Sequence, residues 1–577
     1  MPEKTSSDKS IFTKLLNYQS AIDAAFDELS DHKIIQRIWQ HDFTVWKKSP
    51  GEITNRLGWL HCVENMRGSL AEIQSFAESV YNDGYTKVLL LGMGGSSLAP
   101  ELFSNTFPAS DRSLHLKVLD STDPGAVLSQ SNDLDLSKTL FIVSTKSGST
   151  EETLSFFKYF YNLVVDRLGL ENSGKHFVAI TDPESKLVEI AQNYSFRYIF
   201  YGDPNIGGRY SALTSFGLVP AALCGVDTNL LLERAQSMVS HCSPTIPVRD
   251  NPAAMLGVIL GKLAHQGRDK LTFIFSPQLN SFGDWVEQLI AESTGKQDKA
   301  IVPVIGERLS PPDAYGGDRL FIYIELLGDA ADHDLVMDNL SALKDAGHPS
   351  VHIQISDLYD IAGQFFLWEL ATAIAGWRLQ INPFDQPNVE LAKIRARDLV
   401  RDYKTSNSLP VQSQMLETDN LSVFGNLSAE SPVEAIIKLL SSARPGDYIA
   451  IHAYTQPTIE TSAALDQLRR TLSAKTHLAT TVGYGPRFLH STGQLHKGDR
   501  GNGIFLQLTT LSRDDVSIPD QAGDPDSSIT FGKLILAQAL GDQQALDEQG
   551  RRVLRVHIKH KINDTILALA DEISSQY

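Results

Sequence analysis

The chain has 577 residues, of which 42% are hydrophobic and 8% aromatic, and its formal net charge is -18 at pH 7. This composition is that of a globular protein with enough apolar residues for several cores, and at this length about two or three domains are expected. The negative charge opposes binding to nucleic acid and to anionic membrane surfaces. We therefore expect a small-molecule partner, with no nucleic acid and no membrane among the partners.

The cysteine content and the N-terminus point to the cell interior. Cys62, Cys224 and Cys242 are far apart in the sequence, which argues against a disulfide framework or a zinc site and fits a reducing cytoplasm. Residues 1–10 lack the apolar core of a signal peptide, and no run approaches the roughly 18 apolar residues of a membrane span. A soluble, cytoplasmic protein is expected.

Residues 1–82 are predicted to form a helical lead-in, because apolar residues such as Ile34 and Ile38 recur at helical spacing. From Lys87 onward, short apolar runs alternate with helical segments, which indicates a parallel sheet with helices on both faces. This first α/β domain is expected at 83–240. Its predicted strands are 88–91, 116–119, 140–144, 177–181 and 198–201.

A polar stretch with two prolines, 240–251, precedes a second α/β domain predicted at 251–403. Its expected strands are 271–275, 300–305, 320–325 and 351–355, and helices over 361–378 and 387–403 close it. The segment 404–431 is rich in Ser, Asn and Gln and is predicted to be a linker or a long surface excursion. A third α/β unit is expected at 432–577.

A weak internal similarity relates residues 271–326 to residues 448–508. Gly317-Asp318-Arg319 in the first segment resembles Gly498-Asp499-Arg500 in the second, and each precedes or begins an apolar run. The pattern suggests a partial duplication, although strand-helix-strand units also resemble one another by physics alone.

The most informative stretch runs from a buried strand, 140–144, into a hydroxyl-rich turn and a helix start. Backbone N–H groups at a helix start have no intrahelical partner and stabilise a phosphate dianion. Further side-chain donors come from Thr145, Ser147, Ser149 and Thr150. The alternative is a capping box between Ser149 and Glu152 that binds nothing.

Two glycine-rich turns allow a ligand to approach the backbone. Gly92-Met93-Gly94-Gly95-Ser96-Ser97 follows a predicted strand, but its glycines do not follow the dinucleotide fingerprint, so a nicotinamide site is not expected. Gly207-Gly208-Arg209 brings an always-charged guanidinium near a ligand oxygen. The alternatives are a tight turn without a ligand and a solvated arginine.

Two further segments carry candidate catalytic groups. Gln288 and Glu292 are four apart on a predicted helix, 282–293, and share a face, with Glu292 placed as a general base. Gln386 and Lys393 are seven apart, which predicts one face of a helix opened by proline. The alternatives are an exposed glutamate and a solvated lysine.

Together these segments resemble the phosphoglucose isomerase family, and also the isomerase portion of transaldolase fusions. The matching motifs, in family order, lie at 94–96, 145–150, 207–209, 292–296 and 385–393, within a resemblance that spans roughly 39–403. The resemblance implies an α/β fold with two doubly wound, flavodoxin-like sugar-isomerase domains and an additional C-terminal α/β unit. It also implies interconversion of glucose 6-phosphate and fructose 6-phosphate through a cis-enediol(ate), in glycolysis and gluconeogenesis, without a metal or organic cofactor.

The resemblance also implies roles for individual residues. Glu292 would be the base, Arg209 would stabilise the enediolate, and Lys393 would assist ring opening together with a histidine. The substrate phosphate would be held by Thr145, Lys146, Ser147 and Thr150. The sugar would be bound by Gly95, Ser96, Gly208, Gln288 and Gln386.

The ring-opening histidine is where this sequence departs from the family. The stretch 306–319, where the family carries it, contains no histidine, whereas Leu489-His490-Ser491-Thr492-Gly493-Gln494 resembles another form of the motif. In the family this residue comes from the neighbouring subunit. His490 is therefore the preferred candidate, and the protein would be a homodimer, or a monomer if the C-terminal unit replaces the partner. The alternative is a substitute acid such as Asp313.

Two other functions compete with isomerisation. A sugar-phosphate-binding regulator would keep the phosphate turn, but it needs no base, so Glu292, Arg209 and Lys393 together argue against it. A glutamine-dependent aminosugar synthase needs an N-terminal cysteine, and this chain opens Met1-Pro2. The 82 residues before the first predicted sheet are too few for the eight-stranded barrel of a transaldolase. The preference for glucose or mannose phosphates stays open.

Overall fold

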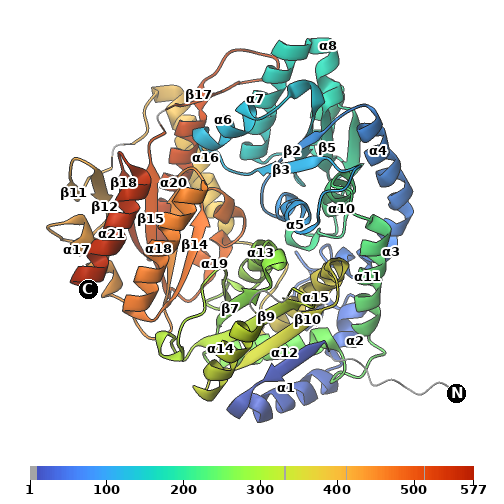
Figure 1. The fold of residues 1–577 in the computed structure, drawn as a ribbon, viewed down its shortest axis with the longest axis vertical. Helices are drawn as coiled ribbons and strands as arrows, with labels where there is room; N and C mark the ends of the chain where they lie inside the picture. The colour runs from blue at the N-terminus through green and yellow to red at the C-terminus, as the bar shows by residue number, and fades with distance from the viewer. Residues whose placement is uncertain (1–9, 330–332, 411, 513) are drawn as a thin grey trace.

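The computed structural model describes residues 10–329, 333–410, 412–512 and 514–577. Three large twisted sheets with covering helices lie around a central helix, α13 (Phe282–Thr294), as Figure 1 shows. Residues 1–9, which make up most of the N-terminal stretch without an apolar signal core, lie outside the described residues. Among the described helices, none is long and apolar enough to cross a bilayer.

The first sheet has the order β3-β2-β4-β5-β6, and all of its neighbouring strands are parallel. Its strands are β2 (Lys87–Gly92), β3 (His115–Leu119), β4 (Thr139–Ser144), β5 (Phe177–Thr181) and β6 (Tyr198–Tyr201). Every residue of β4 is buried, because helices cover both faces of the sheet. The doubly wound parallel sheet predicted from the apolar runs is confirmed.

The second sheet has the order β1-β10-β9-β7-β8. Its strands are β1 (Ile11–Lys14), β7 (Lys270–Phe275), β8 (Val302–Val304), β9 (Arg319–Leu326) and β10 (Ser350–Ile355). β1 is antiparallel to β10, with Ile11 opposite Ile353. The prediction of a helical lead-in is therefore wrong for these four residues, because their partner strand lies more than 300 residues away and only the fold supplies it.

The helices of the lead-in otherwise follow the prediction. They are α1 (Gln19–Asp31), α2 (Ile34–Trp39), α3 (Cys62–Met66) and α4 (Leu70–Asn82). Further helices are α5 (Leu98–Thr106), α7 (Glu151–Leu168), α15 (Ile361–Leu379) and α16 (Val389–Ser406). α15 is buried along almost its whole length and packs on α12 (Pro252–His265) within the core shared by the first two sheets.

The third sheet has the order β11-β12-β18-β15-β13-β14. Its strands are β11 (Leu416–Glu417), β12 (Leu421–Phe424), β13 (Tyr448–Tyr454), β14 (Ala479–Tyr484), β15 (Gly503–Thr510) and β18 (Arg552–Ile558). β11 and β12 fall inside the segment predicted to be a linker, so the linker prediction is wrong for these residues. The apolar run at 421–424 is short and is flanked by polar residues, so its pattern does not predict a strand. It becomes a buried strand because it pairs with β18.

The second and third sheets share one topology, which supports the predicted partial duplication. The parallel strands run β8-β7-β9-β10 in one and β14-β13-β15-β18 in the other, and the outer strand of each carries an antiparallel neighbour, β1 or β12. Gly317-Asp318-Arg319 leads into β9, and Gly498-Asp499-Arg500 stands before β15. The similar tripeptides therefore lie close to the start of equivalent strands, but they are not in the same register, because Arg319 begins β9 and Arg500 precedes Gly503, the first residue of β15.

The C-terminal part packs closely on the rest of the molecule. α20 (Phe531–Glu548) lies along α16, and the ring of Phe531 stacks on Phe156 of α7 at 5.8 Å. α19 (Gly493–Gly498) packs on α13, where a Cβ on Gly498 would lie 2.3 Å from the carbonyl oxygen of Gly295. These contacts bring the loop after β14 to the centre of the molecule.

Candidate active site

A pocket of about 340 Å³ opens among loops that belong to all three sheets. Its lining includes every residue to which the family resemblance assigns a role: Gly95, Ser96, Thr145, Lys146, Ser147, Thr150, Gly208, Arg209, Gln288, Glu292, Gln386, Lys393 and His490. The pocket also contains Arg56 and Asp182, which the sequence did not single out. The residues are thus brought together, while their roles stay predictions.

The hydroxyl-rich turn follows β4 and ends at α7. The Thr145 and Thr150 hydroxyl oxygens lie 2.8 Å apart, and Gly148 supports the turn with a φ of +68°. The N-cap of α7 is Thr150, and its side chain makes no capping hydrogen bond. The alternative capping box is absent, because Ser149 bonds Ser147 instead. First-turn N–H groups of α7 therefore remain available to an anion.

The Lys146 side chain does not extend freely into the pocket. Its Nζ lies 2.6 Å from both carboxylate oxygens of Asp182 and donates to the Asp203 carbonyl at 2.8 Å. Burial lowers the pKa of Lys146 and raises that of Asp182, although their attraction opposes both shifts. The ammonium is thus already paired, and Arg56 is a second cation beside it.

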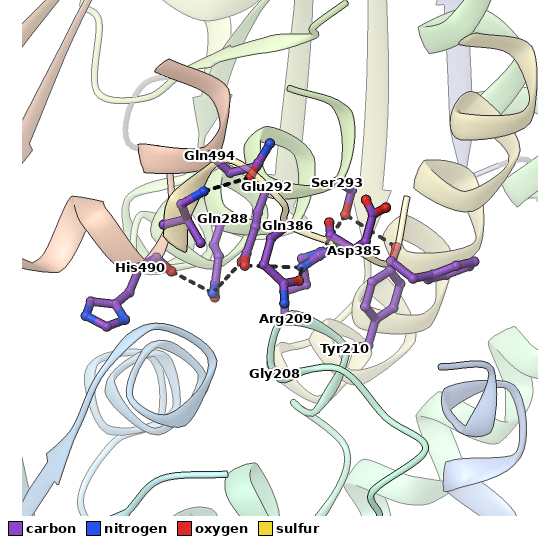
Figure 2. A network of polar contacts seen from close by, with 12 residues as sticks. Gly208, Arg209, Tyr210, Gln288, Glu292, Ser293, Asp385, Gln386, His490 and Gln494 are labelled. Carbon is purple, nitrogen blue, oxygen red and sulfur yellow. Dashed lines mark hydrogen bonds and ion pairs between the residues drawn. The ribbon is translucent and has the colours of Figure 1, made fainter. Parts of the chain in front are cut away.

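Glu292 lies in the last turn of α13, as predicted, and both of its oxygens are engaged (Figure 2). Oε1 lies 3.2 Å from Arg209 Nη1, and Oε2 accepts a hydrogen bond of 3.0 Å from Gln288 Nε2. The same amide nitrogen also donates to the carbonyl oxygen of His490 at 2.9 Å. Gln288 therefore links the carboxylate to the loop that comes from the third sheet.

Arg209 is 3% exposed and is held from several sides. Nε donates to Ser293 Oγ at 2.8 Å, and Nη1 donates to Gln386 Oε1 at 3.0 Å. Nη2 donates to the carbonyl oxygens of Pro383 and Asp385. A guanidinium held by this many acceptors keeps one orientation, and its charge stays beside Glu292.

Glycines set the distance between the two glycine-rich turns. A Cβ on Gly95 would lie 2.1 Å from the carbonyl oxygen of Gly208, and Gly94 adopts a φ of +54°. Any larger side chain at position 95 would push the turns apart. The close approach places Ser96 and Arg209 around the same pocket.

Gln386 and Lys393 both line the pocket, but not as two positions on one helix. α16 begins at Val389, so Gln386 lies in the preceding loop. The predicted common face is wrong because the turn at Pro387 stays outside the helix. Lys393 is in the first two turns of α16, with its Nζ 3.3 Å from Glu390 Oε1.

Comparison with known proteins identifies the family. A sequence model of phosphoglucose isomerase matches residues 61–305. The probable glucose-6-phosphate isomerase of Methanococcus maripaludis is 30% identical over 392 residues, which cover 62% of this chain and 87% of that protein. The chain belongs to the phosphoglucose isomerase family. It is accordingly an enzyme of the aldose–ketose isomerase class.

Further relatives and solved structures agree with this membership. The glucose-6-phosphate isomerase of Campylobacter jejuni is 27% identical over 396 residues, covering 60% of this chain and 92% of that one. The hypothetical protein TT0462 from Thermus thermophilus has a TM-score of 0.58 at 25% identity, covering 67% of this chain and 99% of its own. A Chlamydia trachomatis glucose-6-phosphate isomerase shares the fold, with a TM-score of 0.57 at 18% identity, covering 66% and 86%. The fold predicted from the motifs is confirmed.

His490 enters the pocket of this phosphoglucose isomerase family member from a short turn after β14, η12 (Arg487–His490). Its Nε2 lies 3.0 Å from Glu152 Oε1, and Gln538 Nε2 donates to the same oxygen at 2.7 Å. Asp313, the alternative, lines a separate hollow with Arg268 and His348 and does not line the pocket. Within the chain, His490 and not Asp313 therefore lies at the pocket.

Glu152 is a functional candidate that the sequence presented only as a capping residue. Burial opposes its ionisation, but His490 and Lys393 outweigh this effect, and the pKa of Glu152 is lowered. The sequence predicts Glu152 near the start of a helix, but its partner His490 on η12 is more than 330 residues away in the chain. No motif spacing could have joined the two.

Arg487 anchors the turn that carries His490. Its guanidinium pairs with Asp120 at 3.1 Å, with Asp284 at 3.2 Å and with Glu101. Burial raises the pKa of Asp120 to about 6, although Arg487 opposes the shift. The anchor binds the third-sheet turn to loops and helices of both other sheets.

Gln494 of α19 caps α16 from outside. Its Oε1 accepts hydrogen bonds from the N–H groups of Asn388 at 2.8 Å and Val389 at 3.2 Å, while its Nε2 donates to the carbonyl of Gly295 at 2.8 Å. Helix starts need such acceptors. One side chain of the third unit thus joins the loop of Gln386 to the end of α13.

In the described residues, no group of three or more His, Cys, Asp or Glu is placed to hold a metal.

Proposed function

We propose that this protein interconverts glucose 6-phosphate and fructose 6-phosphate, with Glu292 moving a proton between C1 and C2 through a cis-enediol(ate). The observation that carries the proposal is the pairing of the Glu292 carboxylate with the buried Arg209 guanidinium at 3.2 Å, in the pocket that also holds the hydroxyl-rich turn. A base beside a fixed cation suits a reaction in which negative charge develops on neighbouring oxygens.

The phosphate is proposed to bind at residues 145–150. The free N–H groups at the start of α7 and the hydroxyls of Thr145, Ser147 and Thr150 provide donors. Arg56 adds a second cation to the pocket, and like Lys146 it is paired with a carboxylate, that of Glu52 at 3.0 Å. Binding there sets the distance from the phosphate to the reacting carbons.

Ring opening requires one group to accept the proton of the anomeric hydroxyl and another to supply a proton to the ring oxygen. His490 and Lys393 are proposed to form this acid–base pair, since both line the pocket. Glu152 accepts from Nε2–H of His490, which leaves Nδ1 with a lone pair for the hydroxyl proton. As the ring C–O bond breaks, the carbonyl forms.

Isomerisation then proceeds on the open chain. Glu292 takes the proton from C2 of the aldose, and the electron pair forms the C1–C2 double bond of the enediol(ate). Arg209 stabilises the charge that develops on the oxygens. The carboxyl group returns the proton to C1, and a proton passes from O2 to O1, so fructose 6-phosphate results with no net change in the enzyme.

The test is a coupled assay with fructose 6-phosphate on wild type and Glu292→Gln. The amide keeps the size of the side chain but cannot accept the proton, so kcat should fall by about 10²- to 10⁴-fold. Binding of the sugar phosphate, measured by calorimetry, should persist in the variant. Similar rates in the two proteins would remove Glu292 as the base, and binding without turnover in wild type would favour a regulator.

The third unit is proposed to replace a partner subunit, because His490 lines the pocket of the same chain that carries Glu292. On this proposal the protein is active as a monomer. Glucose 6-phosphate and fructose 6-phosphate are intermediates of glycolysis and gluconeogenesis. We propose that the protein acts in these pathways, in the cytoplasm.

A further inference from the structure

A buried amide from the third unit lies behind the catalytic pocket. Gln538 is on α20 and is 4% exposed. Its Nε2 donates to Glu152 Oε1 at 2.7 Å, and its Oε1 accepts from the Thr122 hydroxyl at 2.7 Å. With the contact between Glu152 and His490, these bonds form one chain that passes repeatedly between the first sheet and the third unit.

The partners determine how the amide is oriented. An ionised carboxylate only accepts hydrogen bonds, so the nitrogen of Gln538 must face Glu152. The Thr122 hydroxyl then donates to the amide oxygen, which supports the same orientation. A reversed amide would set its oxygen against the Glu152 carboxylate, and this repulsion in a buried place disfavours the reversal.

The carboxylate oxygen of Glu152 thus receives two donors, Gln538 Nε2 at 2.7 Å and His490 Nε2 at 3.0 Å. Hydrogen bonds to a charged acceptor are stronger than neutral ones, and they favour the ionised form. The ionised form in turn requires a proton on Nε2 of His490. The tautomer of the imidazole therefore depends on a residue that does not line the pocket.

We propose that Gln538 is a positioning residue for ring opening, which holds Glu152 ionised and in place so that His490 presents a basic Nδ1 to the sugar. The inference rests on the proposed function, since it assigns a part in that reaction. It extends the contribution of the third unit, which supplies both the histidine and the support for the carboxylate that orients it.

The decisive variant is Gln538→Glu, which keeps the shape but replaces the amide with a group that titrates. Two carboxylates at this distance repel each other, so the pair retains one proton at low pH and loses it only at higher pH. The protonated variant can still donate to Glu152, and the ionised one cannot. The kcat of the variant relative to wild type should therefore fall by about tenfold or more between about pH 6 and pH 9.

Two further variants separate this role from a structural one. Gln543→Glu is the matched control, because Gln543 is on the same helix, is 5% exposed and accepts from Arg555 Nε at 2.9 Å. Its pH profile should follow wild type. Gln538→Met removes the donor without adding charge, and its kcat should be about tenfold lower at every pH, with KM changed less than about twofold.

The outcomes distinguish this inference from the proposed function. If wild type converts fructose 6-phosphate and Glu292→Gln does not, the function stands. A Gln538→Glu profile parallel to wild type, or a Gln538→Met kcat equal to wild type, would then overturn the role of Gln538 alone. If Gln538→Glu does not fold, Gln538→Met decides. A wild type without isomerase activity would overturn both.

Discussion

At the scale of single residues, the buried guanidinium of Arg209 is stabilised by the acceptors around it. Removing a guanidinium from water is costly unless its donors find acceptors, and here the acceptors are Ser293, Gln386, two backbone carbonyls and Glu292. The geometry is prepared before substrate binds. Such a preorganised charge stabilises a developing oxyanion without reorganisation during the reaction.

The first prediction at this scale separates His490 from the alternative acid. His490→Ala removes the acid–base group at the ring, so kcat with cyclic substrate should fall by about 10²-fold or more. Asp313→Ala is the matched control and should retain the wild-type kcat, because Asp313 lines a different hollow. A coupled assay over a range of fructose 6-phosphate concentrations provides both values. Unchanged turnover in His490→Ala would exclude the relocated histidine.

At the scale of elements, helix ends organise the site. α7 directs its free N–H groups at the hydroxyl-rich turn, α13 brings Glu292 to its last turn, and α16 starts beside Gln386. The start of α16 is completed by the side chain of Gln494 from α19. Elements from distant parts of the sequence therefore share their capping groups.

Gln494→Leu tests this shared cap. It leaves the N–H groups of Asn388 and Val389 without their acceptor, so the free energy of unfolding should fall by about 1–3 kcal/mol. The loop before α16 should also loosen, which raises KM through Gln386. Urea unfolding followed by circular dichroism measures the first effect. Gln544→Leu, which removes an exposed bond to Glu548, should change stability by less than about 0.5 kcal/mol; equal losses in both variants would argue against a cap.

At the scale of the whole molecule, the third unit completes the pocket. Its sheet repeats the topology of the second sheet, and its η12 turn holds His490 against Glu152 of the first sheet. Three units thus surround one pocket, with Arg487 pairing to acids from the other two. All proposed catalytic groups belong to one chain.

A pocket that is complete within one chain should keep its activity when the protein is diluted. An enzyme whose site is completed by another subunit loses specific activity as its subunits separate, whereas a self-contained site does not. Specific activity should therefore stay constant as the protein is diluted from about 1 µM to about 1 nM with an inert carrier protein present. Light scattering should report a monomer of 63.5 kDa. Loss of activity on dilution, with recovery on concentration, would contradict the self-contained site.

Much of the architecture and most of the pocket could be predicted from local sequence. Fully buried parallel strands such as β4 leave continuous apolar runs, and the loops at their carboxyl ends carry the motifs in order. Strands whose burial depends on a distant partner, β1 and β12, left no comparable signal. Edge strands are short, and pairing rather than composition decides them.

The sequence by itself determined the fold class, the order of the motifs and most of the residues around the pocket, because spacing along a strand or helix is a local property. Only the tertiary structure decided that Lys146 pairs with Asp182, that Asp313 lies elsewhere, and that Glu152, His490 and Gln538 form one chain. The physical reason is that these contacts join groups far apart along the backbone, and their geometry follows from how the three sheets pack.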